Sequence, residues 1–150
     1  MALKARIKDE MKAALLSGDR FVGETLRNLT AAILDEEVKL GKRDEGLSDE
    51  EIEKVVAREV KKRNESAKIY RDNNRPDLAE PEEREIEILQ AYLPKQLDET
   101  ELAAIIEAKI AELSVTGPQA MGRVIGAVKK QVGNAADGAA IARIVKQKLD

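Results

Sequence analysis

The chain has 150 residues, of which 37% are charged and 2% are aromatic, and its formal net charge is −3. It contains neither cysteine nor histidine, which excludes disulfides, thiol nucleophiles and the imidazole that most often serves as general base or metal ligand. A chain of this length forms one domain or two small subdomains. Because its apolar residues are mainly aliphatic, we expect an all-α protein.

The first 94 residues predict about four helices, spanning about residues 2–16, 20–40, 49–72 and 77–92. The first helix has an apolar residue at every fourth position from Leu3 to Leu15, which is the spacing of one buried helix face. The third opens with a capping box, in which Ser48 and Glu51 each accept a hydrogen bond from the other's backbone N–H. Pro81 is tolerated only in a first helical turn, so the regular part of the fourth helix is expected to begin there.

Pro94 marks the expected boundary between an N-terminal helical subdomain, residues 1–94, and a small C-terminal three-helix subdomain, residues 95–150. The three later helices are expected over about residues 99–113, 118–132 and 138–149. Asp98 begins a second capping box, and Asp137 is a suitable cap for the last helix. Gly122 and Gly126 lie one helical turn apart, which predicts close packing against a neighbouring helix.

Basic charge is concentrated near the end of the chain. Residues 121–149 hold six bases and one acid, whereas residues 1–94 hold 18 bases and 22 acids. Nucleic-acid phosphates are contacted by Lys and Arg, by helix N-termini and by backbone amides that glycine leaves accessible. The segment supplies all of these groups, and six residues are the candidates for nucleic-acid contact: Arg123, Lys129, Lys130, Arg143 and Lys146 at phosphates, and Gly138 where the backbone allows close approach.

The same segment has no aromatic residue on which bases could stack. Contact with the shape and backbone of folded RNA is therefore favoured over sequence-specific reading of single strands. A solvated helix face explains the same charge pattern without any ligand. A second basic stretch, residues 57–75, has seven bases and three acids, and this mixture is typical of a solvated surface with ion pairs.

Nothing in the sequence predicts a catalytic residue, a metal site or a cofactor. The acidic clusters at residues 35–37, 49–51 and 82–83 have no histidine to complete a di-metal motif. The first residues lack the apolar core of a signal peptide, and Asp9 and Glu10 argue against a mitochondrial presequence. No run approaches the ~20 apolar residues of a membrane span. These features predict a cytoplasmic protein without a membrane partner.

Several motifs stand in a recognisable order, with TLRNLTAAILDEEV at residues 25–38 and MGRVIGAV at residues 121–128. The most specific are AYLPKQL at residues 91–97 and ADG at residues 136–138. Together they resemble the YqeY family, relatives of the tail domain of GatB, the B subunit of the glutamine-dependent aspartyl/glutamyl-tRNA amidotransferase. The resemblance covers essentially the whole chain. Pro81 and the Phe21-Val22-Gly23 entry to the second helix depart from the usual family pattern.

The resemblance implies an all-helical fold of two subdomains and a part in holding tRNA or another structured RNA. It also links the chain to carbon–nitrogen ligases that use glutamine as amido-N-donor, although their catalytic domains are not present in these 150 residues. The leading hypothesis is therefore a non-catalytic RNA-binding module. Two alternatives are a helical adaptor that holds a protein partner and, with no nucleophile–base pair to support it, an enzyme of the amidotransferase class.

Overall fold

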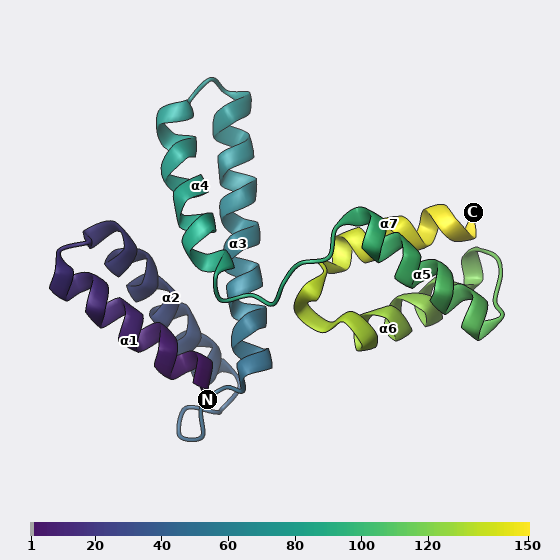
Figure 1. Cartoon of the computed structure of the whole chain (residues 1–150), viewed down its shortest axis with the longest axis horizontal. Helices are drawn as coiled ribbons and strands as arrows, with labels where there is room; N and C mark the ends of the chain where they lie inside the picture. The colour runs from purple at the N-terminus through teal and green to yellow at the C-terminus, as the bar shows by residue number, and fades with distance from the viewer. Residues whose placement is uncertain (1) are drawn as a thin grey trace. The chain divides into compact units, whose positions relative to one another are not determined.

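The computed structural model describes residues 2–150 and contains helices and loops, with no strand in that range (Figure 1). The prediction of an all-α protein is confirmed. The α-helices are α1 (Ala2–Ser17), α2 (Arg20–Lys39), α3 (Asp49–Asp72), α4 (Pro76–Gln90), α5 (Glu99–Leu113), α6 (Met121–Val132) and α7 (Gly138–Leu149), with 3-10 turns η1 (Pro118–Ala120) and η2 (Gly133–Ala135). The chain divides into two compact units, the first ending at Leu93 and the second running Pro94–Asp150.

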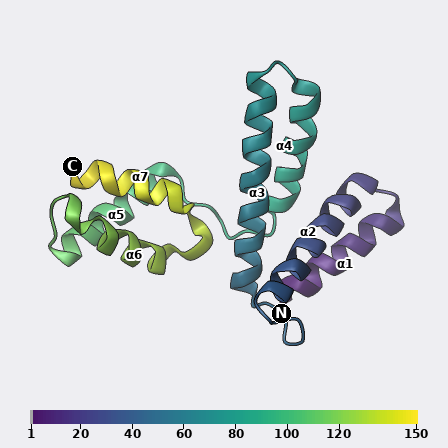
Figure 2. The same ribbon diagram turned by 180° about the vertical axis from the view of Figure 1, so that it is seen from behind.

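The first unit consists of two helical hairpins, α1–α2 and α3–α4, which both views show (Figures 1 and 2). Aliphatic residues from all four helices form its core, together with Leu47 from the α2–α3 loop and Tyr92 after α4. Gly23 lies where α1 meets α2, and a Cβ at this position would displace the Leu15 side chain, since it would lie 2.5 Å from Leu15 Cδ2. The expected apolar stripe of α1 is buried at Ile7 and ends at Leu15, which is partly exposed.

The predicted capping box of α3 is present. Ser48 Oγ accepts from the Glu51 N–H at 3.2 Å, and Glu51 Oε1 accepts from the Ser48 N–H at 3.0 Å. Lys42 donates to the other Glu51 oxygen at 2.8 Å. The Lys42 bond, with the help of the Ser48 N–H, lowers the pKa of Glu51 to about 2. The start of α3 is therefore fixed by side chains that lie close to it in sequence.

Polar contacts of Lys4 and Glu10 help to tie α1 to the rest of the first unit. Glu37 on α2 is buried, and its Oε2 accepts from Lys4 Nζ at 2.6 Å and from the Leu47 N–H at 3.4 Å. The Tyr92 hydroxyl donates to Glu10, and this bond lowers the pKa of Glu10. Burial, with the Glu10 bond, raises the pKa of Tyr92. These contacts hold the start and the middle of α1 against later parts of the chain.

Helix α4 begins at Pro76, close to the expected residue 77. The expectation that its regular part begins at Pro81 is wrong, because Pro81 lies inside the helix. Pro76 occupies the first turn, where the missing N–H is not needed, and Ala79 is fully buried. Packing of this turn therefore keeps the helix continuous, although Pro81 cannot donate a hydrogen bond to the carbonyl four residues earlier.

The second unit packs α5, α6 and α7 around one aliphatic core, whose fully buried members are Ile106, Val124, Val128 and Val145. Asp98 caps α5 by accepting from the Glu101 N–H at 2.7 Å. The prediction that Asp137 caps α7 is wrong, because its side chain makes no cap hydrogen bond. Residues 118–120, expected in the sixth helix, form the separate turn η1. Within residues 2–150, no helix combines the length and apolarity that crossing a bilayer requires.

Candidate nucleic-acid interface

Helix α6 presents a basic face to solvent. Its buried residues, Val124 and Val128, define the side that packs on the core, and Arg123, Lys129 and Lys130 are exposed. The helix has no carboxylate, and these three cations form no ion pair within the described residues 2–150. Their charge therefore faces solvent without internal compensation.

The two glycines of α6 lie on this exposed face, which corrects the prediction that they pack against a neighbouring helix. A Cβ on Gly122 or Gly126 would meet nothing within 4 Å, and both residues are exposed. Exposed glycine in a helix interior costs about 0.5–1 kcal/mol relative to alanine. No contact in the second unit offsets this cost. The helix backbone at these two glycines is therefore exposed to solvent beside the cations, with no side chain to cover it.

Two positive groups meet where α7 begins. A Cβ on Gly138 would lie 3.4 Å from Lys129 Cε and 3.5 Å from Lys129 Nζ. Gly138 is the first residue of α7, whose N-terminal N–H groups carry a partial positive charge. Asp137 stands beside them but accepts no cap hydrogen bond. An ammonium next to a helix N-terminus is unfavourable by itself, and an anion at this point would be attracted by both groups.

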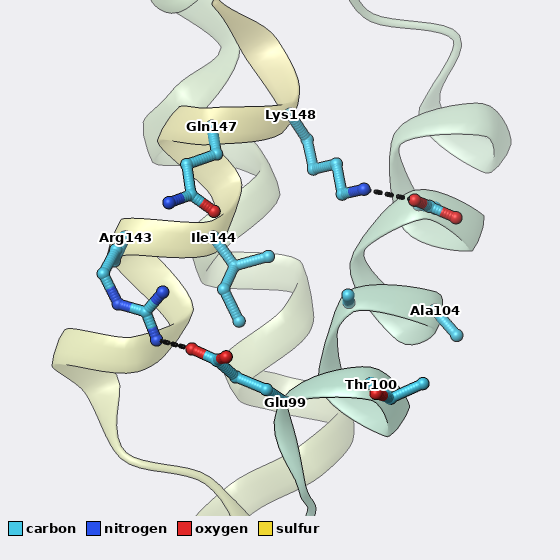
Figure 3. A pocket seen from close by; sticks show the side chains of 9 residues that line it. Glu99, Thr100, Ala104, Arg143, Ile144, Gln147 and Lys148 are labelled. Carbon is cyan, nitrogen blue, oxygen red and sulfur yellow. Dashed lines mark hydrogen bonds and ion pairs between the residues drawn. The ribbon is translucent and has the colours of Figure 1, made fainter.

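Helix α7 has the other three bases of residues 121–149, and two of them are already paired. Arg143 donates to Glu99 and Lys148 donates to Glu107, so both bridge from α7 to α5 (Figure 3). Lys146 is exposed and forms no ion pair in the part of the chain that the structure describes. The predicted cations are thus of two kinds: within residues 2–150, Arg123, Lys129, Lys130 and Lys146 form no ion pair, and Arg143 is held by a carboxylate.

The ion pairs of α7 cross an open groove between α5 and α7. Arg143, Ile144, Gln147 and Lys148 line it from α7, and Glu99, Thr100, Ala103, Ala104 and Glu107 line it from α5 (Figure 3). Sequence reasoning assigned no role to Lys148, Glu99 or Glu107. Spacing along the chain could not reveal these contacts, because the partners are 41 and 44 residues apart.

The second basic stretch, residues 57–75, is arranged differently. Six of its seven bases form ion pairs: Arg58 with Glu36, Lys62 with Glu59, Arg63 with Glu59 and Glu85, Lys68 with Asp72, Arg71 with Glu83, and Arg75 with Asp77. Burial raises the pKa of Glu59, but hydrogen bonds from Lys62 and Arg63 outweigh it and leave this pKa lowered. The interpretation of this stretch as a surface with ion pairs is confirmed.

Among residues 2–150 the structure groups no three His, Cys, Asp or Glu side chains in a way that could hold a metal ion. The features that do stand out are cations, exposed backbone and a helix N-terminus, all in the second unit. Fold and surface together define a class: an all-α protein of two units, the second of which presents a cationic, glycine-rich helix face.

Comparison with known proteins identifies the family within this class. The YqeY-like protein family matches residues 4–149, and the chain belongs to that family. The resemblance drawn from the motifs is confirmed.

The chain is also similar to yeast proteins named "Altered inheritance of mitochondria protein 41, mitochondrial". It is 34% identical to the protein from Eremothecium gossypii, over 75% of this chain and 61% of that protein. It is 29% identical to the protein from Lachancea thermotolerans, over 76% of this chain and 61% of that protein. The chain thus spans about three fifths of the length of these relatives.

These relatives correct the expected location. The sequence predicted a cytoplasmic protein, and the relatives are named as mitochondrial proteins, which contradicts that prediction. The prediction rested on the composition of the first residues and on the lack of a long apolar run. Such features report what a chain can bury or insert, whereas a compartment is specified by a separate targeting signal.

Proposed function

We propose that this protein is a non-catalytic RNA-binding module that holds tRNA or another structured RNA by its phosphate backbone. The contact surface is the exposed face of α6 with the start of α7, and we name it the α6 cationic face: Gly122, Arg123, Gly126, Lys129, Lys130 and Gly138. Lys146, exposed on α7, adds a further phosphate contact.

One observation carries the proposal: Lys129 Nζ lies against Gly138 at the N-terminus of α7, so an ammonium and a helix dipole act on the same point. A phosphate there would receive charge-assisted hydrogen bonds from both groups. Lys130 and Arg123 extend the positive charge along α6, and the bare backbone at Gly122 and Gly126 admits a close ligand.

The chemistry of the second unit favours structured RNA over single strands. The chain's three aromatics, Phe21, Tyr70 and Tyr92, all precede Pro94, so the α6 cationic face offers no ring for base stacking. Phosphate contacts and shape are then the available means of recognition. The resemblance to the tail domain of the glutamine-dependent tRNA amidotransferase supports this proposal, since such a module would hold the RNA while other domains do the chemistry.

Binding of a labelled tRNA transcript across a salt series tests this function. The triple variant Arg123→Ala, Lys129→Ala, Lys130→Ala is expected to bind at least about 10-fold more weakly and to lower the slope of log K against log salt by roughly 2–3, since each released phosphate contact contributes ~0.7–0.9. A matched triple on α3, Lys61→Ala, Lys62→Ala, Lys68→Ala, removes the same charge from the first unit and is expected to leave the slope unchanged.

Absence of salt-dependent binding, or equal losses in the two triple variants, would contradict the proposal. That result would favour the helical adaptor. The first unit exposes Leu16 (90% exposed), Val38 (58%) and Ile69 (60%), one on each of α1, α2 and α3. Pull-down with these residues changed to Ser would then test them as contacts for a protein partner.

A further inference from the structure

The two paired bases of α7 differ from the cations of the α6 cationic face. Arg143 and Lys148 reach across the α5–α7 groove to Glu99 and Glu107, while Ile144 lies between them on α7 (Figure 3). They are five residues apart, a rise of about 7.5 Å along the helix. Two cations of one helix are thus held by two carboxylates of another, at the edge of an open groove.

These ion pairs are exposed enough to exchange with a ligand. The side chains of Arg143 and Glu99 are 49% and 66% exposed, and those of Lys148 and Glu107 are 37% and 58% exposed. Ion pairs in such exposed positions contribute little to stability, because solvent screens them. A phosphate oxygen accepts the same hydrogen bonds as a carboxylate oxygen, and Arg binds either group with two parallel bonds.

Resting on the function proposed above, we propose that Arg143 and Lys148 form a second, latent phosphate-binding edge, which Glu99 and Glu107 occupy in the free protein. A phosphodiester backbone displaces the two carboxylates and takes their place on α7. The carboxylates thereby act as an internal competitor. Ligands that reach only the α6 cationic face leave these pairs intact, and a folded RNA that reaches both places gains the additional contacts by displacing the carboxylates.

The chemistry has a measurable consequence. In the free protein these two cations are already neutralised, so a ligand that pairs with them must first separate them from α5. In a variant without the carboxylates no ion pair has to be separated first. The affinity for RNA should therefore rise, and each cation released for phosphate contact should steepen the slope of log K against log salt by about 0.7–0.9.

The experiment titrates one fluorescein-labelled tRNA transcript with the full chain at several salt concentrations. The double variant Glu99→Gln, Glu107→Gln is expected to bind about 5–10-fold more tightly than wild type, and its salt slope is expected to be steeper by roughly 1.5–2. Glu112→Gln is the matched control: it removes one charge from the same helix and frees Lys109, also on α5, while both α7 pairs stay intact. We expect less than a twofold effect for this control.

A mutant cycle separates a specific release from a general gain of positive charge. If Glu99→Gln acts through Arg143, adding Arg143→Gln should abolish its gain. An equal gain in the presence and absence of Arg143 would overturn the inference. Thermal unfolding followed by circular dichroism accompanies each variant. A Glu99→Gln protein that melts several degrees lower and binds no more tightly would show that the pairs only hold α5 against α7, and would also overturn it.

The outcomes keep the two proposals apart. Wild-type binding that depends on Arg123, Lys129 and Lys130 but is unchanged by Glu99→Gln and Glu107→Gln would preserve the proposed function and reject the latent edge. If neither the wild-type protein nor the double variant Glu99→Gln, Glu107→Gln binds the transcript, both proposals are rejected. Tighter binding and a steeper slope in the double variant, lost on Arg143→Gln, would support both.

Discussion

Two basic stretches of similar charge content have opposite environments in this protein. In residues 57–75, six of seven bases are paired with carboxylates, several of them on neighbouring helices of the first unit. In residues 121–149, two of six bases form ion pairs within the described residues 2–150. The number of bases in a segment is therefore a poor guide to free positive charge, and the positions of the nearby acids decide it.

The difference in ion pairing between the two stretches has a local cause and a tertiary cause. Helix α3 has its own acids three or four residues from its bases, as in Lys62–Glu59 and Lys68–Asp72, and this is the spacing at which side chains meet on a helix. Helices α6 and α7 contain no acid at all. Their bases can be neutralised only from another helix, and α5 does this for Arg143 and Lys148 alone.

The comparison predicts that bases of α3 stabilise the fold and bases of α6 do not. Arg63 is 13% exposed and bonds to Glu59 at 3.1 Å and to Glu85 on α4 at 3.0 Å. Arg63→Ala leaves two half-buried carboxylates without this partner and should reduce the free energy of unfolding by about 2 kcal/mol. Lys130→Ala, at an exposed and unpaired position, should change it by less than about 0.5 kcal/mol.

Urea unfolding of the two variants measures this difference. Equal effects of Arg63→Ala and Lys130→Ala on the unfolding midpoint would break the distinction between the two stretches. The slope of the transition should be unchanged in both variants, because neither substitution alters the surface exposed on unfolding.

A single carboxylate should make α6 resemble α3. Ala127→Glu places an acid four residues after Arg123 and three residues before Lys130, within reach of both. The expected result is about fivefold weaker binding of tRNA, with a change in stability below about 0.5 kcal/mol. Ala127→Gln is the control for side-chain size and should bind as the wild type does. A loss of affinity in both variants would assign the effect to bulk rather than charge.

The glycines of α6 give the smallest expected effect. Gly122→Ala and Gly126→Ala should each raise the free energy of unfolding by about 0.5–1 kcal/mol, because the new methyl groups meet no atom and the helix gains propensity. Gly23→Ala should give no such gain, since its methyl group would overlap Leu15. Thermal unfolding measures all three variants. A loss of stability on Gly122→Ala or Gly126→Ala would show that the new methyl group meets neighbouring atoms, so that the backbone there is not open to solvent. If RNA approaches that backbone, the α6 variants should also bind tRNA a few-fold more weakly.

Most helices could be predicted from local patterns, and the errors arise where packing or a side-chain rotamer decides. The capping box at Ser48 was predicted correctly, and of the box predicted at Asp98 the bond from the Glu101 N–H to the Asp98 side chain is present, because a cap involves residues only three apart. The regular part of α4 was expected only from Pro81, because burial of Ala79, which holds a helical turn before Pro81, is not encoded by a local pattern. Asp137 occupies the cap position of α7 without capping it, since the hydrogen bond also depends on its side-chain rotamer.

The candidate interface was predicted by residue type, but the sequence could not give its arrangement. All six predicted residues lie in the second unit, five of them cationic, as the charge pattern indicated. The pairing of Arg143 with Glu99 and the position of Lys129 beside Gly138 depend on how α5, α6 and α7 pack. The expected packing of Gly122 against a helix was wrong, because a small-residue spacing does not show which face of a helix is buried.

By itself the sequence determined the all-α class, most helix starts and ends, and the concentration of bases in residues 121–149. It could do so because helix propensity, capping and net charge depend on residues that are near neighbours in the chain. The tertiary structure alone decided which bases are free and which are paired, and which glycines are exposed. Those properties depend on side chains brought together from different helices, up to 44 residues apart in the pairs that cross the α5–α7 groove. A local sequence pattern does not specify contacts between residues so far apart in the chain.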